Sequence, residues 1–357
     1  MDSQRHVIVE LWKGGGRMRI ECVGSGSLGL LFAARLSDAG ADVVLITSTE
    51  EQADRLNAEG VALQDGSGTI YRAVAAECYR EAAAGSPDSE ERDADWLLLT
   101  VKQKHITPEL ARWLAKRIGL KTRLICFQNG IGHAERLAAE IPPDRIYVAV
   151  TTEGARRDGL NHVSHTGWGV TRIGKAFTGS GGNGSKNGTY VPLPEDAQDD
   201  AYFDENEKNM RQLFLSAGFE TFLSKHMDSF IWQKLLINAV INPLTALLGV
   251  TNGKLPELPE CRELMDKLVT EVCEVASANG IPLQTGGMIS EVLDVCVRTA
   301  LNHSSMLQDL ASGRMTEIEW INGSLLREAD EHHIALPVNR TLYALVKAKE
   351  RTIVKES

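Results

Sequence analysis

The spacing of apolar residues changes once along the chain. From residue 18 to about residue 210, short runs rich in Val, Ile and Leu alternate with helix-like segments, which is typical of a parallel sheet with crossover helices. Beyond that point strand-like runs nearly stop, and apolar residues recur at helical spacing. The pattern therefore predicts an α/β domain followed by an all-helical domain, with the boundary near residues 210–225.

The predicted elements have lengths that are usual in globular proteins. The predicted strands are 19–23, 42–46, 96–101, 123–127 and 146–151, followed by a hairpin-like pair at 162–164 and 170–173. The predicted helices after residue 205 are 206–217, 226–248, 258–279, 287–296, 302–311, 314–332 and 338–350.

Two segments fall outside this pattern. Residues 1–17 precede the first predicted strand and end near three consecutive glycines, so we interpret them as an N-terminal extension. Residues 178–190 are rich in Gly, Ser and Asn, and the acidic residues 195–207 follow, so we interpret about 178–207 as a flexible insertion. The expected division is an extension at 1–17, a nucleotide-binding domain at 18–222 and a helical substrate domain at 223–357.

A glycine-rich loop, GSGSLG at 24–29, directly follows the first predicted strand and begins a helix-like segment. In this position Gly24 allows a tight turn, Gly26 lets a pyrophosphate approach the backbone, and Gly29 lets the helix pack against the strand. The loop, including Ser25, Ser27 and Leu28, therefore predicts dinucleotide binding; the alternative is a purely structural turn.

The end of the second predicted strand bears on the choice of dinucleotide. Thr47, Ser48 and Thr49 stand where an acidic residue would accept from a ribose 2′-hydroxyl and repel a 2′-phosphate. The absence of an acid favours NADP(H), but no Arg stands at this strand end. Ser48 and Thr49 could contact a phosphate, with Arg55 reaching it from the next helix, or they could cap that helix. The choice between NADPH and NADH stays open at this point.

Polar side chains also follow two other predicted strands. Lys102 comes directly after 96–101, and Asn129 follows 123–127. Ligands of open parallel sheets bind beyond the carboxyl ends of the strands, so both residues are candidates for the cofactor site. The alternatives are a solvated loop cation for Lys102 and a simple turn at Asn129-Gly130.

A single polar line crosses the otherwise apolar segment 232–252. Lys234, Asn238 and Asn242 are spaced four residues apart and share one face of a helix. Burying an ammonium and two carboxamides is costly unless polar groups meet them, so this line predicts a ligand-binding face. The alternative is a scaffold network of buried Asn with a Lys that reaches water. Pro243 is expected to kink the helix beside Asn242.

A second polar cluster lies at 302–323. Asn302, Ser305 and Asp309 are spaced for one helix face, and Thr316 and Glu317 could begin the next helix after Gly313. Capping and surface roles are individually commoner than catalysis. The density of polar residues in this one segment favours a site.

Charge and composition narrow the classes of partner. A formal net charge of -10 argues against nucleic acid or an anionic membrane as the main partner, and the apolar runs are interrupted before they reach membrane-spanning length. Six cysteines without a C-x-x-C pair indicate reduced thiols in a cytoplasmic protein. No metal site is predicted, because the histidine pairs at 162/165 and 332/333 lack acids at ligand spacing, and surface or turn positions are expected for them. The residues leave the oligomeric state open; a homodimer is the working expectation.

Taken together, the motifs resemble the 2-dehydropantoate 2-reductase (ketopantoate reductase) family over about residues 18–351. The motifs that carry the resemblance are GSGSLG at 24–29, VK at 101–102, QNG at 128–130, residues 151–157 with HTGWG at 165–169, WQKLLINAVINPLTALLGVTNG from residue 232 and SSMLQDLASGRMTEIEWING from residue 304. The last two motifs are the most specific.

The resemblance implies a Rossmann domain, an all-helical C-terminal domain and NADPH-dependent reduction of 2-dehydropantoate to (R)-pantoate, a step towards pantothenate and coenzyme A. It further implies that Lys234 is the general acid and that Glu317 acts beside it. Four residues match substrate-binding positions: Asn238, Asn242, Asn302 and Ser305. Lys102 and Asn129 match the cofactor–substrate junction.

Two departures accompany the resemblance. The family often has an Arg where this chain has Ser48, and the insertion at 178–207 is longer than usual. Two alternative functions fit the same residues: a paralogous reductase of another small 2-oxoacid, and a non-catalytic NADP(H)-binding regulatory protein.

Overall fold

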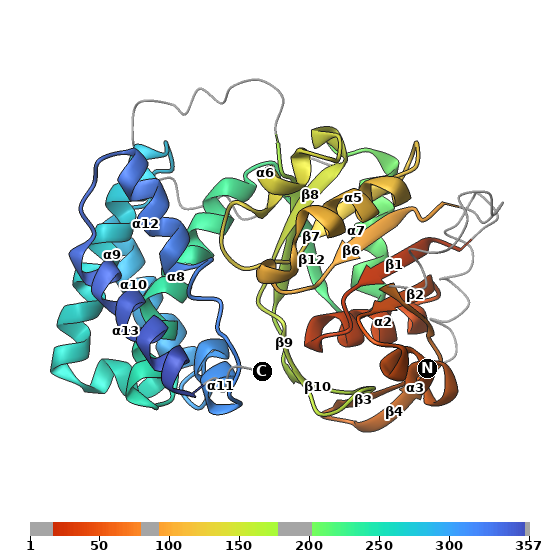
Figure 1. The fold of residues 1–357 in the computed structure, drawn as a ribbon, viewed down its shortest axis with the longest axis horizontal. Helices are drawn as coiled ribbons and strands as arrows, with labels where there is room; N and C mark the ends of the chain where they lie inside the picture. The colour runs from red at the N-terminus through yellow and green to blue at the C-terminus, as the bar shows by residue number, and fades with distance from the viewer. Residues whose placement is uncertain (1–16, 80–92, 178–201, 354–357) are drawn as a thin grey trace.

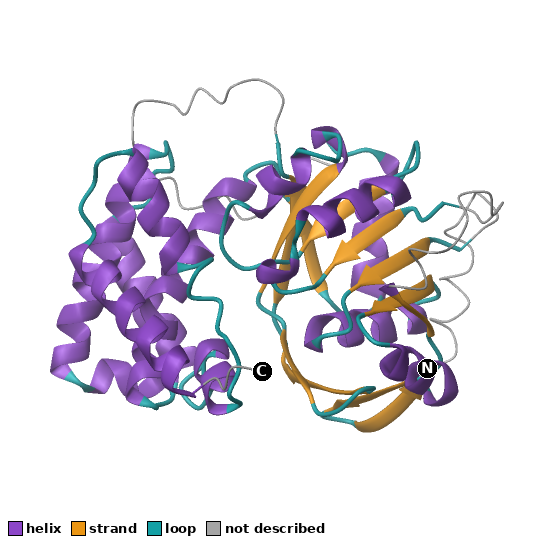
Figure 2. Ribbon diagram, viewed as in Figure 1, coloured by secondary structure: helices purple, strands orange, loops and turns teal. Residues whose placement is uncertain are grey.

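The computed structural model describes residues 17–79, 93–177 and 202–353. A region built on β-sheets and a region built from helices lie side by side, with helix α8 (Met227–Leu248) at their junction (Figures 1 and 2). The predicted fold class, an α/β domain followed by an all-helical domain, is confirmed. The predicted extension lies outside the described residues, except residue 17, as does most of the predicted insertion.

The main sheet has eight strands in the order β12-β11-β8-β7-β6-β1-β2-β5. The six strands from β8 to β5 are parallel, and β11 runs antiparallel to β8. Crossover segments cover both faces of such a sheet, so its central strands are mostly buried, and β6 is apolar throughout. The bounds are β1 Arg19–Val23, β2 Asp42–Thr47, β5 Ala75–Cys78, β6 Trp96–Leu99, β7 Arg123–Cys126, β8 Ile146–Thr151, β11 Val170–Lys175 and β12 Glu220–Leu223.

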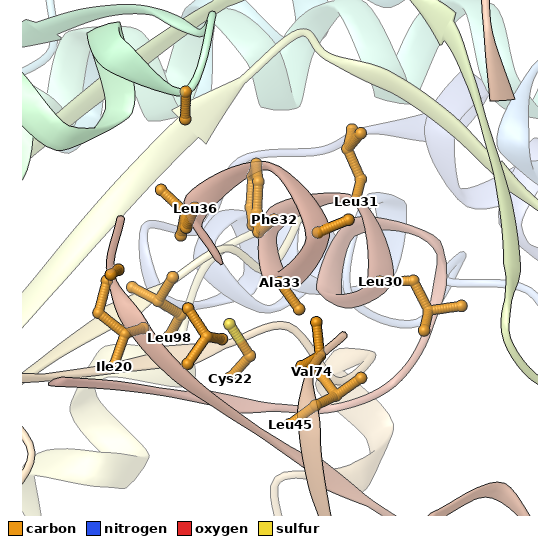
Figure 3. Close-up of a cluster of buried hydrophobic side chains, with 14 of the residues drawn as sticks. Ile20, Cys22, Leu30, Leu31, Phe32, Ala33, Leu36, Leu45, Val74 and Leu98 are labelled. Carbon is orange, nitrogen blue, oxygen red and sulfur yellow. The ribbon is translucent and has the colours of Figure 1, made fainter. Parts of the chain in front are cut away.

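Helix α2 (Ser27–Asp38) packs its apolar side chains against this sheet. Figure 3 shows them in one cluster with Ile20, Cys22, Leu45 and Leu98, all of which are fully buried. This packing fixes the glycine loop at the junction of β1 and α2. The other helices of this region are α3 Glu50–Glu59, α5 Pro108–Arg117, α6 His133–Ala138 and α7 Glu205–Ser216.

A second, four-stranded sheet has the order β4-β3-β10-β9. The predicted hairpin at 162–164 and 170–173 is therefore wrong: β10 pairs with β3 and β9, whereas β11 pairs with β8 and β12 in the main sheet. Only Trp168 and Gly169 separate the two strands, and a side chain at Gly169 would lie 2.4 Å from the Thr152 backbone. The chain crosses between sheets there. The bounds are β3 Val61–Asp65, β4 Gly68–Arg72, β9 Gly154–Arg157 and β10 His162–Gly167.

Helix α8 forms the centre of the helical region. It packs against α9, α11 and α13 on one side and reaches β8 and β11 on the other. By length and composition α8 could cross a membrane, but most of it is buried inside the protein, as expected of a core helix. The remaining helices are α9 Pro259–Ala278, α10 Thr285–Arg298, α11 Ser305–Ala311, α12 Asn322–Glu331 and α13 Pro337–Ile353.

Pro243 lies inside α8, which continues through it to Leu248. Because proline has no N–H, the carbonyl of Ala239 loses its usual intrahelical donor. Asn322 Nδ2 at the start of α12 donates to Ala239 O at 3.1 Å and replaces that donor. The proline therefore creates an attachment point between α8 and α12.

The predicted start of the helix that follows Gly313 is wrong. The expected helix 314–332 begins only at Asn322, because Thr316 is held elsewhere: its N–H and its hydroxyl both donate to the buried Glu350 carboxylate on α13. Glu317 therefore lies in a turn.

The acidic end of the predicted insertion is also not a loop, since Asp204 and Glu207 form a capping box that begins α7.

Candidate active site

The glycine loop has the geometry that its sequence predicts. Gly24 has φ of +117°, and a Cβ there would lie 2.8 Å from the Val101 backbone. A Cβ on Gly29 would lie 1.8 Å from Gly24 O, whereas one on Gly26 would meet nothing within 4 Å. Gly24 and Gly29 thus serve the turn and the strand–helix contact, and the open side of Gly26 suits a pyrophosphate against the first turn of α2.

The side chains of the loop are held by residues that sequence reasoning missed. Ser25 Oγ donates to Gln52 Oε1 at 2.6 Å, and the buried Gln52 donates back to Ser25 O at 3.1 Å. Ser27 Oγ accepts from Arg157 N at 3.1 Å, and Arg157 Nη1 donates to Ser25 O at 3.3 Å. Leu28 packs against the core. The small sheet therefore brings the Arg157 guanidinium to the loop. Arg157 stands six residues after the end of β8, and nothing in that spacing predicts a contact with the loop.

The residues at the end of β2 have different surroundings. Thr49 caps α3 by accepting from Gln52 N at 3.3 Å, so the capping alternative holds for Thr49. Ser48 is exposed. Arg55 pairs with Glu59 on the exposed face of its own helix rather than facing the strand end. A phosphate near Ser48 would thus meet hydroxyls rather than Arg55 in this arrangement.

Lys234 lies at the junction of the two regions. Its Nζ donates to Thr151 O, at the end of β8, at 2.8 Å. Burial lowers the pKa of Lys234 to about 8, and the negative charge of Glu317 opposes this shift. The ammonium therefore releases its proton more readily than an exposed lysine would.

Glu317 and Asn129 meet beside this lysine. Asn129 Nδ2 donates to Glu317 Oε2 at 3.1 Å. The turn after Asn129 allows this contact: Gly130 has φ of +84°, and a Cβ there would lie 1.9 Å from Trp320 O. The structure thus brings Lys234, Glu317 and Asn129 together from three separate segments.

Lys102 forms a second link between the two regions. Its Nζ lies 2.5 Å from Asp309 Oδ2, and Arg314 Nε lies 3.2 Å from the other oxygen of the same carboxylate. Asp309 is buried on α11. The end of β6 is therefore tied to the helical region by a carboxylate between two cations.

The four predicted substrate-binding residues lie at different depths. Asn238 is half-buried and Asn242 is buried, both on α8, whereas Asn302 and Ser305 are exposed. The predicted helix face of Asn302, Ser305 and Asp309 is wrong, because α11 begins at Ser305 and Ser304 caps it. Thr245 donates to Ser304 Oγ at 2.7 Å, which holds the start of α11 against α8.

Within residues 17–79, 93–177 and 202–353, no group of three metal-ligating side chains comes together. The expected surface position is wrong for His165, which is fully buried and lies with Nε2 2.7 Å from Glu153 Oε2. The Glu153 carboxylate follows β8 in the sequence and reaches β10 through this contact. The pair joins the two sheets where the chain crosses between them.

Comparisons with known proteins identify the family of this chain. Residues 20–177 match the family described as ketopantoate reductase PanE/ApbA, and residues 226–350 match its C-terminal part. The chain is 33% identical to the 2-dehydropantoate 2-reductase of Halobacterium salinarum, over 94% of this chain and 99% of that protein. It is also 33% identical to that of Bacillus subtilis, over 95% and 99%.

Solved structures show the same fold. A crystal structure of the probable 2-dehydropantoate 2-reductase from Bacillus subtilis matches with a TM-score of 0.71 at 32% identity, covering 93% of this chain and 99% of that one. A D-mandelate dehydrogenase bound to NADH and anilino(oxo)acetate matches with a TM-score of 0.81 at 23% identity, covering 95% and 100%. With matches to both parts of the family over most of its length, the chain belongs to the ketopantoate reductase family.

Proposed function

We propose that this protein is an NADPH-dependent reductase that converts 2-dehydropantoate to (R)-pantoate, with Lys234 as the general acid. The observation that carries this proposal is the desolvated ammonium of Lys234 beside the Asn129–Glu317 pair. Family membership supports the substrate and the cofactor, and the open side of the glycine loop at Gly26 fits a dinucleotide.

The chemistry follows from the charge that develops during ketone reduction. NADPH held by the glycine loop would supply a hydride for the ketone carbon, which would leave negative charge on the carbonyl oxygen. Lys234 stabilises that charge and donates its proton to the oxygen, which completes the hydroxyl. Thr151 O holds the amine in place by accepting from Nζ at 2.8 Å.

The remaining polar residues suit a small hydroxylated 2-oxoacid. Asn238, Asn242, Asn302 and Ser305 provide neutral donors for the substrate carboxylate once the substrate lies against α8. The carboxylate of Glu317 accepts from the primary hydroxyl of the substrate. Asn129 positions the Glu317 carboxylate by donating to it. Lys102 and Asn129 would lie where the cofactor meets the substrate.

The pH dependence of turnover should reflect Lys234. Its pKa is lowered to about 8, and the protonated form is the active one. We therefore expect kcat for ketone reduction to be highest below pH 8 and to fall as pH rises through that value. Steady-state rates between pH 6 and 10 measure this limb; a kcat that stays constant to pH 10 would contradict the assignment.

The substrate is tested by kinetics with 2-dehydropantoate and a panel of other small 2-oxoacids, each with NADPH and with NADH. We expect the highest kcat/KM for 2-dehydropantoate with NADPH. A higher value for another 2-oxoacid would indicate the paralogous reductase. Binding of NADPH without turnover of any ketoacid would indicate a regulatory protein.

We further propose a cytoplasmic location. All six cysteines are free and buried, as expected of a reducing compartment. A homodimer, with no nucleic-acid or membrane partner, remains our proposal for the assembly. Sedimentation of the purified protein would measure its mass in solution.

A further inference from the structure

A small cavity of about 10 Å³ lies beside Lys234. Its polar wall consists of Gln128, Asn129, His133 and Lys234. Gly130 and apolar residues of β8 and α8 complete the lining. A single buried water needs roughly this much space, about 10–15 Å³, together with two to four polar partners.

His133 can offer the cavity only a donor. Gln103 Nε2 donates to Ile131 O at 2.9 Å, which fixes the orientation of that amide, and it also lies 3.2 Å from His133 Nδ1. Nδ1 is therefore the acceptor, and the proton of the neutral ring is on Nε2. Burial, with a smaller contribution from Arg136, lowers the pKa of His133 to about 4, so the ring is neutral at pH 7. Its Nε2 is buried without a partner among the described residues.

Gln128 can offer the cavity only an acceptor. Its Nε2 donates to Leu99 O at 2.8 Å and to Val101 O at 2.9 Å, so both amide protons are used. Its Oε1 is buried and has no partner in the described part of the chain. A buried polar atom of this kind is costly unless something meets it.

We propose that this cavity holds one water molecule, which accepts from His133 Nε2 and from Lys234 Nζ and donates to Gln128 Oε1. The water makes His133 a positioning residue for Lys234, and the inference rests on the proposed role of Lys234 as the acid. An ammonium has three N–H groups. Thr151 O accepts from one and the water from a second, which leaves the third for the substrate oxygen.

Two substitutions at His133 test the water. His133→Leu removes the donor, whereas His133→Gln can place an amide N–H near the position of Nε2. We expect His133→Leu to lower kcat about three- to tenfold, the worth of one hydrogen bond, with little change in KM. Since an acceptor stabilises the ammonium, the alkaline limb of kcat should move to lower pH. His133→Gln should restore both properties.

The pH dependence of kcat distinguishes a positioning role of His133 from an effect of its charge. His133 is neutral at pH 7, so its removal changes no charge near Lys234, and Glu317, the charged group that acts on Lys234, is unchanged. A high-resolution crystal structure should show the water in the wild type and not in His133→Leu.

Two results would overturn the inference: a cavity without ordered water, or a His133→Leu variant with wild-type kcat and alkaline limb while Lys234→Ala is inactive. Wild-type turnover in Lys234→Ala would instead remove the proposed acid itself. Thermal unfolding and NADPH binding of both His133 variants control for damage to the fold.

Discussion

Lys234→Ala is expected to lower kcat for 2-dehydropantoate reduction about 10²–10⁴-fold, the usual worth of acid–base assistance. Among the described residues, the substitution removes the one ammonium that lines the small cavity, and it leaves the developing oxyanion without its proposed proton donor. Binding of NADPH, measured by fluorescence titration, should change little because the glycine loop lies on the other region.

Lys234→Arg is the matched control, since it keeps the positive charge but cannot release a proton near neutral pH. We expect it to recover only part of the lost rate. The Lys234→Ala protein should unfold at a temperature close to that of the wild type, because the change removes a desolvated charge together with its hydrogen bond to Thr151. Turnover near the wild-type rate in Lys234→Ala would end the proposed mechanism.

Gly29→Ala is expected to disrupt the nucleotide site more than any other single methyl addition in the glycine loop. Its Cβ would lie 1.8 Å from Gly24 O, a backbone atom that cannot move without displacing the turn between β1 and α2. We expect the affinity for NADPH to fall at least about 100-fold and the melting temperature of the ligand-free protein to fall by several degrees. Isothermal titration and thermal unfolding measure the two effects.

Gly26→Ala is the control within the same loop. Its Cβ would meet nothing within 4 Å, and the backbone there has φ of −77°, which alanine adopts freely. The ligand-free protein should therefore unfold as the wild type does. NADPH should bind more weakly, because the methyl occupies the side open to the pyrophosphate. Equal NADPH affinity in Gly26→Ala and the wild type would contradict the placement of the cofactor.

Strands of the main sheet could be predicted because the apolar residues that indicate a strand lie within the strand itself. The predictions for 19–23 and 146–151 agree with β1 and β8 at both ends, since short runs that contain Val and Ile indicate buried strands. The alignment of Lys234, Asn238 and Asn242 also followed from helical spacing alone, and α8 contains all three.

The remaining features depend on partners far away in the sequence. The pairing of β10 with β3 joins residues about 100 positions apart. The alternation of apolar and polar residues along a strand does not indicate which strand pairs with it. The turn that presents Glu317 depends on Glu350, a contact between α13 and a loop. Asp309 was expected beside Asn302, but it lies against Lys102 across the domain junction.

The hydrogen bond from Lys234 to Thr151 O has a consequence for how this enzyme would lose activity. The amine and its acceptor come from opposite halves of the molecule, so the proposed acid keeps its position only while those halves stay docked. If mild warming separated the two halves by a few ångströms, the enzyme would lose activity while its helices and strands stayed folded. On heating, we therefore expect loss of activity to precede global unfolding.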